Sequence, residues 1–85
     1  MSVKIYVVFG ESGECSGMER WIVKAYYNQD EAKLLMENAQ KEANLLEIKA
    51  NNDEIDPWDA KNIYDKNYRM VYHEVNYDIV EVELE

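Results

Sequence analysis

The segment from Asn28 to about Lys49 most constrains the fold of this 85-residue chain. Asn28 is a good helix N-cap, and Glu31 follows three residues later, as in a capping box. Six apolar residues then recur at helical spacing on one face: Ala32, Leu35, Met36, Ala39, Ala43 and Leu46. The pattern predicts one long helix that ends near Asn51 and Asn52, with an apolar stripe that a sheet must cover.

Three segments around this helix have the alternation of β-strands. Residues 3–9 place four apolar side chains on one face (Val3, Ile5, Val7 and Phe9), and we expect the helix to cover this odd-numbered face. Residues 19–26 predict a second strand. Phe9 of the first strand and Trp21 of the second are expected to pack inside. Residues 71–84 predict a third, in which Val80, Val82 and Leu84 alternate with glutamates, so that one face is buried. A bulge or turn is expected at residues 75–78.

A short second helix is predicted after the long one. Asp56 is a suitable cap and Pro57 suits the first helical position, with an end near Tyr64 and Asp65. The predicted fold is therefore α+β, a single domain over residues 1–85. It has a three- to four-stranded antiparallel sheet with one long helix packed on one face and a short second helix (ββααβ order). The last strand lies beside the first, which leaves the second strand at an edge.

The charge is strongly negative and uneven. The chain has 18 Asp and Glu against 9 Lys and Arg, a net charge of −9, and residues 51–85 alone hold 10 acids and 3 bases. This disfavours direct nucleic-acid binding and favours a basic protein partner. The alternative is that the charge only confers solubility. With no long apolar run, no signal peptide and a single cysteine, Cys15, the expected location is the cytoplasm.

No catalytic or metal-binding set rises above chance in the sequence. Cys15 has an acidic neighbour, Glu14, which opposes thiolate formation. His73 lacks a second histidine or a ligating cysteine, so a zinc site is not predicted. The acidic run that begins at Asp53 lacks the glycine and the terminal glutamate of a calcium loop. We therefore expect a protein that is not an enzyme and that holds no metal or cofactor.

A docking patch in the acidic half of the chain is the main functional prediction. Aromatic rings beside charge are typical of interfaces. The alternative is that these rings only close a small core. The predicted partner-binding residues are two aromatic anchors and six carboxylates: Trp58 and Tyr68, with Asp53, Glu54, Asp56, Asp59, Glu81 and Glu83.

Several segments resemble small bacteriophage and mobile-element proteins. The resemblance rests on KIYVVFG at residues 4–10, WIVKAY at 21–26, NQDEA at 28–32, YDKNYRM at 64–70 and YDIVEVEL at 77–84. It implies an inhibitor of host machinery, such as an anti-CRISPR protein that mimics nucleic acid and binds a host nucleic-acid-binding complex. No functional residue is carried over from it. Two alternatives stay open: a small-ligand (nucleotide) binding protein with a site at a dimer seam, and a self-associating structural module that uses its edge strand.

Overall fold

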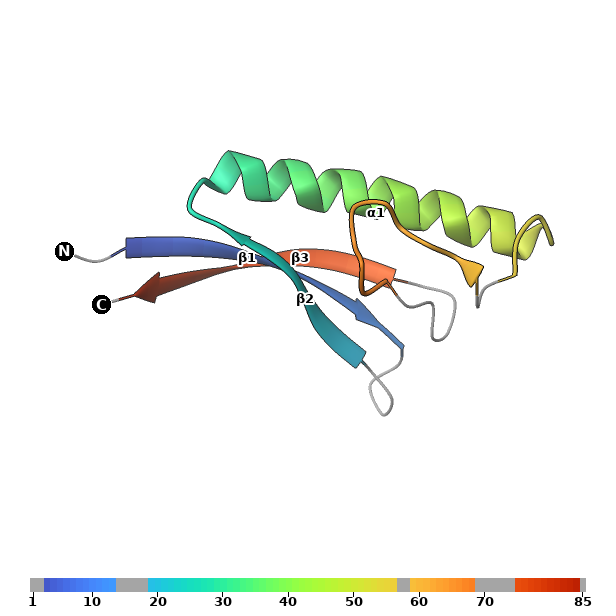
Figure 1. Cartoon of the computed structure of the whole chain (residues 1–85), viewed down its shortest axis with the longest axis horizontal. Helices are drawn as coiled ribbons and strands as arrows, with labels where there is room; N and C mark the ends of the chain where they lie inside the picture. The colour runs from blue at the N-terminus through green and yellow to red at the C-terminus, as the bar shows by residue number, and fades with distance from the viewer. Residues whose placement is uncertain (1–2, 14–18, 57–58, 69–74, 85) are drawn as a thin grey trace.

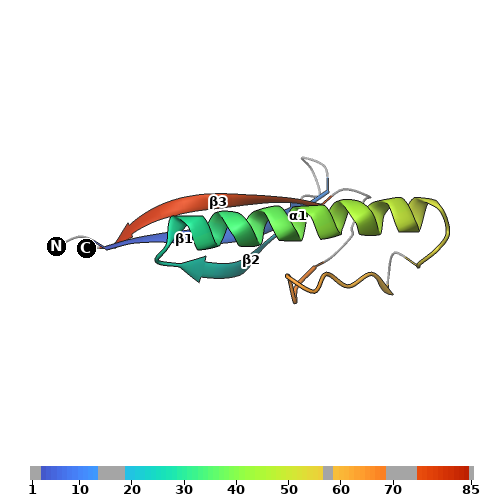
Figure 2. The same cartoon turned by 90° about the horizontal axis from the view of Figure 1, so that it is seen from above.

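A computed structural model describes residues 3–13, 19–56, 59–68 and 75–84. The elements are β1 (Val3–Ser12), β2 (Glu19–Tyr26), α1 (Gln29–Asn51) and β3 (Val75–Leu84). Figures 1 and 2 show two layers, with α1 lying lengthwise over one side of the sheet. The antiparallel α+β arrangement with one long helix on one face agrees with the sequence prediction.

The helix begins where its cap was predicted. The Asn28 Oδ1 atom accepts hydrogen bonds from the backbone N–H groups of Asp30 at 2.8 Å and Glu31 at 3.1 Å. These bonds satisfy two of the donors that a helix start leaves free. At the other end, the Asn52 N–H donates to the Ile48 carbonyl, and Asp53 follows with a positive φ of 59°. The chain turns away from the helix axis at this point.

The strand order is β2-β1-β3, with both pairings antiparallel. The last strand therefore lies beside the first, as predicted. The bulge predicted at residues 75–78 is wrong, because β1 and β3 pair in unbroken register from Ser12–Val75 to Val3–Leu84. The irregularity lies between β1 and β2, at Val8 and Phe9. The predicted strand residues 71–74 are outside the described part of the chain.

The predicted second helix is wrong. The described residues after α1 form turns, with an isolated bridge between Asn62 and Asp65. Each of these two side chains accepts a hydrogen bond from the backbone N–H two residues later, Tyr64 at 2.9 Å and Asn67 at 3.0 Å. Such local bonds compete with helical hydrogen bonding, so the segment folds as turns. The predicted first position, Pro57, is outside the described residues.

The helix covers the opposite face of β1 from the one predicted. Val8 is fully buried and Ser12 is almost so, whereas Val3 remains 45% exposed. The covered face is therefore the even-numbered one. On the helix side of the interface, four of the six stripe residues are buried (Ala32, Ala39, Ala43 and Leu46), and Leu35 and Met36 are half-buried.

Gly10 and Asp65 explain why the covered face is the even-numbered one. Gly10 lies opposite Trp21 in the sheet, and a Cβ at Gly10 would come within 2.7 Å of the indole ring. The missing side chain lets this ring lie against the strand. The indole Nε1 then donates to Asp65 Oδ2 at 2.7 Å, and the Tyr77 hydroxyl donates to the same oxygen at 2.8 Å. Both rings therefore need the side of the sheet where the turn with Asp65 lies.

Candidate functional site

The odd-numbered side of the sheet is apolar and has no helix on it. We call it the open face and define it by eight apolar side chains from all three strands: Val3, Ile5, Val7, Phe9, Ile22, Val80, Val82 and Leu84. The strand register places them together, because Val7 pairs with Val80, Phe9 with Ile22 and Ile5 with Val82. Directly paired residues in antiparallel strands point to the same face.

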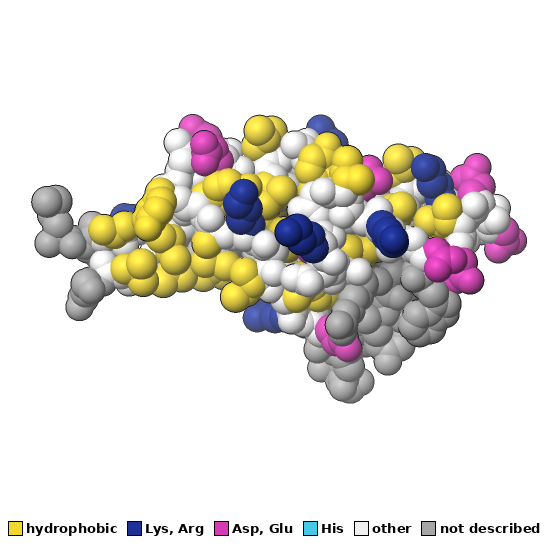
Figure 3. Space-filling view, in the orientation of Figure 1, with side chains coloured by type: hydrophobic (Ala, Val, Ile, Leu, Met, Phe, Trp, Pro, Cys, Tyr) yellow, Lys and Arg dark blue, Asp and Glu magenta, His cyan; other side chains and the backbone are white. Residues whose placement is uncertain are grey.

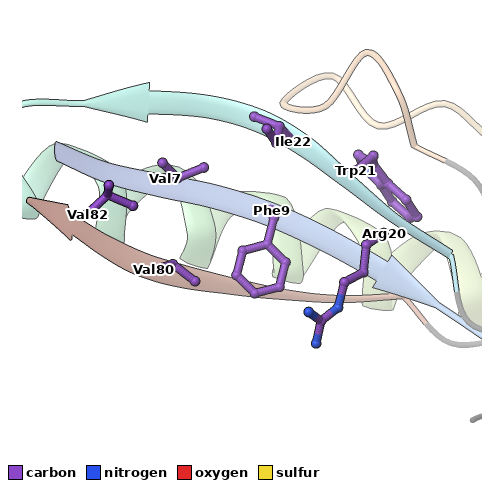
Figure 4. A pocket seen from close by; sticks show the side chains of 7 residues that line it. All are labelled: Val7, Phe9, Arg20, Trp21, Ile22, Val80 and Val82. Atoms are coloured by element: carbon purple, nitrogen blue, oxygen red, sulfur yellow. The ribbon is translucent and has the colours of Figure 1, made fainter. Parts of the chain in front are cut away.

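The open face has a shallow hollow at its centre. The hollow has a volume of about 650 Å³ and is lined by Val7, Phe9, Arg20, Trp21, Ile22, Val80 and Val82. Figure 4 looks onto it with α1 behind the sheet, and the Phe9 ring lies over the strands between Val80 and Arg20. Space-filling atoms show apolar side chains along the strand layer below the helix (Figure 3). The surface is broad and open, which fits a macromolecular contact better than an enclosed small-ligand site.

Exposure distinguishes this face from an ordinary core. Ile22 is 66% exposed, and Val80 and Leu84 are almost half exposed. The prediction that Val80, Val82 and Leu84 point to a buried face is therefore wrong. Phe9, which was predicted to pack inside, is half-buried on the open face. Trp21 does pack against the core. Contiguous exposed apolar area of this kind is typical of interaction surfaces.

Charge is sparse on the open face. Among the described residues, the register places Glu11, Arg20 and Asp78 on this side of the sheet. Arg20 Nε lies 3.0 Å from Glu11 Oε2, and its guanidinium carbon is 5.3 Å from the centroid of the Phe9 ring. The Arg20 cation is therefore paired within its own chain. This arrangement gives no support to the alternative of a nucleotide site built on clustered cations.

The predicted carboxylates do not form one patch. Asp53, Glu54, Asp56 and Asp59 are exposed and follow the C-terminal end of α1, where acidic side chains gather in Figure 3. Two others, Glu81 and Glu83, lie near the C-terminal end of β3, at the opposite end of the molecule (Figure 1). Glu81 is paired there with Lys4, at 3.5 Å between Oε1 and Nζ.

The two predicted aromatic anchors have different outcomes. Trp58 lies outside the described residues. Tyr68 packs against the core cluster of Ala39, Ala43, Val75 and Tyr77, and its hydroxyl is buried without a hydrogen-bond partner in the described structure. Burial first, and then the nearby carboxylates, raise the pKa of Tyr68 to about 12. Tyr68 therefore contributes to the core, which was the alternative interpretation of the aromatic residues.

The buried ionisable groups serve the fold. Both Asp65 oxygens accept hydrogen bonds, Oδ2 from Trp21 and Tyr77 and Oδ1 from the Asn67 N–H. Burial and the bond to Asp65 raise the pKa of the Tyr77 hydroxyl, which keeps it protonated as a donor. No group of three or more His, Cys, Asp or Glu side chains suited to a metal ion occurs among the described residues. The lone Cys15 and His73 are outside them.

Sequence reasoning missed the open face because it assigned those residues to the core. A signal was present, since both faces of β1 are apolar: Tyr6 and Val8 alternate with Ile5, Val7 and Phe9. A strand with two apolar faces indicates that each face has something to contact. One helix can cover only one side of a three-stranded sheet.

Comparisons with known proteins do not identify the function of the open face. Over the described residues, α1 is the longest helix, and no helix is apolar enough over a sufficient length to span a membrane. No protein-family model matches the chain, and neither the curated proteins nor the solved structures give a match.

Proposed function

We propose that this protein is a protein-binding module without chemistry of its own, and that the open face is its docking surface. The observation that carries the proposal is the set of eight apolar side chains on a sheet face that no described element covers. Removing that area from water stabilises a complex by about 25 cal/mol per Å² before the costs of association. The central Phe9 ring and the branched side chains around it are suited to an interface core.

Photo-crosslinking in the producing cells tests this proposal directly. A photoreactive amino acid replaces either Ile22 or Ile63, which are 66% and 80% exposed. Only Ile22 lies on the open face, so we expect strong covalent adducts to protein from position 22 and weak ones from position 63. Equal adduct yields from the two positions would contradict the proposal.

A second candidate function uses the acidic segment after α1. The four exposed carboxylates at Asp53, Glu54, Asp56 and Asp59 gather at one end, which supports contact with a basic surface. In this case the protein would be an inhibitor that occupies the nucleic-acid site of another protein. Binding of that kind weakens as salt rises, because exposed charge pairs are screened within about 8 Å at physiological ionic strength. Apolar docking through the open face would not weaken in this way.

A further inference from the structure

We infer that the occupant of the open face is a second copy of this chain, so that two sheets pack face to face between two outer helices. The inference rests on the proposed function, because it names the partner of the same surface. Two such sheets would lie about 10 Å apart with their apolar side chains interdigitated. The interface would be isologous, with the same eight side chains contributed by each copy.

Surface area is the first argument for a second copy. The chain has 6234 Å² of accessible surface, whereas a compact monomer of its 10.1 kDa would have only about 5,300 Å². The excess of about 900 Å² matches the roughly 800 Å² that each partner buries in an interface of standard size. The open face can therefore supply the area that a stable dimer needs.

Shape leads to the same conclusion. The molecule measures 52 × 27 × 14 Å, and its radius of gyration is 14.0 Å against about 12 Å for a compact domain of this length. It is an elongated two-layer particle of one helix on one sheet, and its thinnest dimension runs across the strands rather than through the two layers (Figures 1 and 2). Packing a second copy on the open face would extend the 27 Å dimension, along which α1 lies over the sheet, and produce a four-layer particle with the apolar face inside.

The core within one chain is small. The buried apolar residues of the described structure are Val8, Ala32, Ala39, Ala43, Leu46, Val75 and Tyr77. Three of them are alanines, and Val8 is the largest side chain that is completely buried. Four further large apolar side chains lie outside this core on the open face: Ile5, Phe9, Ile22 and Leu84. A chain of this size gains stability from association, and a second copy is present wherever the first is made.

Charge selects this face for contact between copies. Two chains that each carry −9 repel each other over most of their surfaces. On the open face, Glu11 and Arg20 neutralise one another, which leaves Asp78 as the uncompensated charge among the described residues of that face. Contact between two open faces therefore brings together the parts of the two surfaces where repulsion is weakest. Added salt should strengthen the dimer, because it screens the remaining repulsion.

The test is the solution mass of the chain and of two matched variants, Ile22→Lys and Ile63→Lys. For the unmodified protein we expect twice the 10.1 kDa chain mass by sedimentation equilibrium, with a dissociation constant that falls as salt rises. Ile22→Lys should raise the dissociation constant by about 30-fold or more, as for loss of an interface hot spot. Ile63→Lys, exposed but off the open face, should leave it unchanged. Circular dichroism checks that both variants fold, and Val80→Lys is the replacement if Ile22→Lys does not.

Two outcomes would overturn the inference, and they separate it from the proposed function. In the first, the chain stays monomeric up to about 300 μM but binds an apolar dye, and Ile22→Lys abolishes the dye binding. The open face is then a docking surface whose partner is not a second copy. A dimer that neither Ile22→Lys nor Val80→Lys weakens is held by another surface, which contradicts the inference but not the proposed function, which the crosslinking yields at positions 22 and 63 decide.

Discussion

The two faces of the sheet differ in what holds their side chains. On the covered face, buried apolar residues are combined with a polar network in which Asp65 accepts from Trp21 and Tyr77. On the open face, the side chains are apolar but partly exposed, and the polar groups lie at one end as the Glu11–Arg20 pair. Apolar content alone therefore does not identify the core. The buried hydrogen-bond partners decide which side the helix covers.

The largest effect should come from Asp65→Ala. The carboxylate is only 3% exposed, and its removal leaves the Trp21 N–H and the Tyr77 hydroxyl buried without this acceptor. We expect a loss of about 3 kcal/mol in the free energy of unfolding, measured by urea denaturation. Asp59→Ala, at an exposed position near the start of the same segment, is the control and should change it by less than about 0.5 kcal/mol. Similar losses in the two variants would show that the network does not fix the covered face.

A smaller effect should separate the two faces directly. Val8→Ala removes methyl groups from a fully buried site and should cost about 2 kcal/mol of unfolding free energy. Val80→Ala makes the same change at a site that is 45% exposed, and it should cost under about 0.5 kcal/mol in protein dilute enough to be monomeric. At high concentration the cost of Val80→Ala should grow, because the dimer buries that side chain. A constant cost across concentrations would mean that the open face stays in water.

The smallest effect concerns Tyr68 and pH. Its pKa is raised from 10.0 to about 12 in the folded chain, chiefly by burial, so the unfolded chain loses the proton first. The contribution of the protonated Tyr68 hydroxyl to the free energy of unfolding is therefore fully present below pH 10, and it is lost as the pH rises toward 12. Tyr68→Phe should change the unfolding free energy by less than about 1 kcal/mol at pH 7 and should reduce its fall in alkali. Tyr64→Phe, at an exposed position, should retain the full alkaline fall; an identical pH profile for both variants would contradict burial of the Tyr68 hydroxyl.

The elements could be predicted because their causes are local. The Asn28 cap, the stripe from Ala32 to Leu46 and the alternation in β1 and β2 are each set by nearby residues. The second helix could not be excluded from the sequence, because Asp56 and Pro57 form a good helix start. The turns formed by Asn62 and Asp65 gain from partners distant in sequence: Asn62 Nδ2 donates to the Ala39 carbonyl at 3.0 Å, and Trp21 donates to Asp65.

The candidate site was less predictable than the fold. Negative charge along residues 51–85 predicted a single docking patch, but linear density does not fix placement in space. β3 runs back along the sheet and carries Glu81 and Glu83 to the opposite end from Asp53 (Figure 1). The aromatic Tyr68 was expected at the surface, and the fold uses it against the core.

Local sequence patterns were enough to predict the strands β1 and β2, the single long helix with its cap and the antiparallel order, since periodicity and short connections specify these, and the net charge follows from composition. Which face of β1 meets the helix depends on contacts between residues far apart in the chain. Both faces are apolar enough, and the choice depends on Gly10 admitting the Trp21 ring and on Asp65 reaching both Trp21 and Tyr77. Those contacts join residues as far as 44 positions apart, and a local pattern carries no information about them.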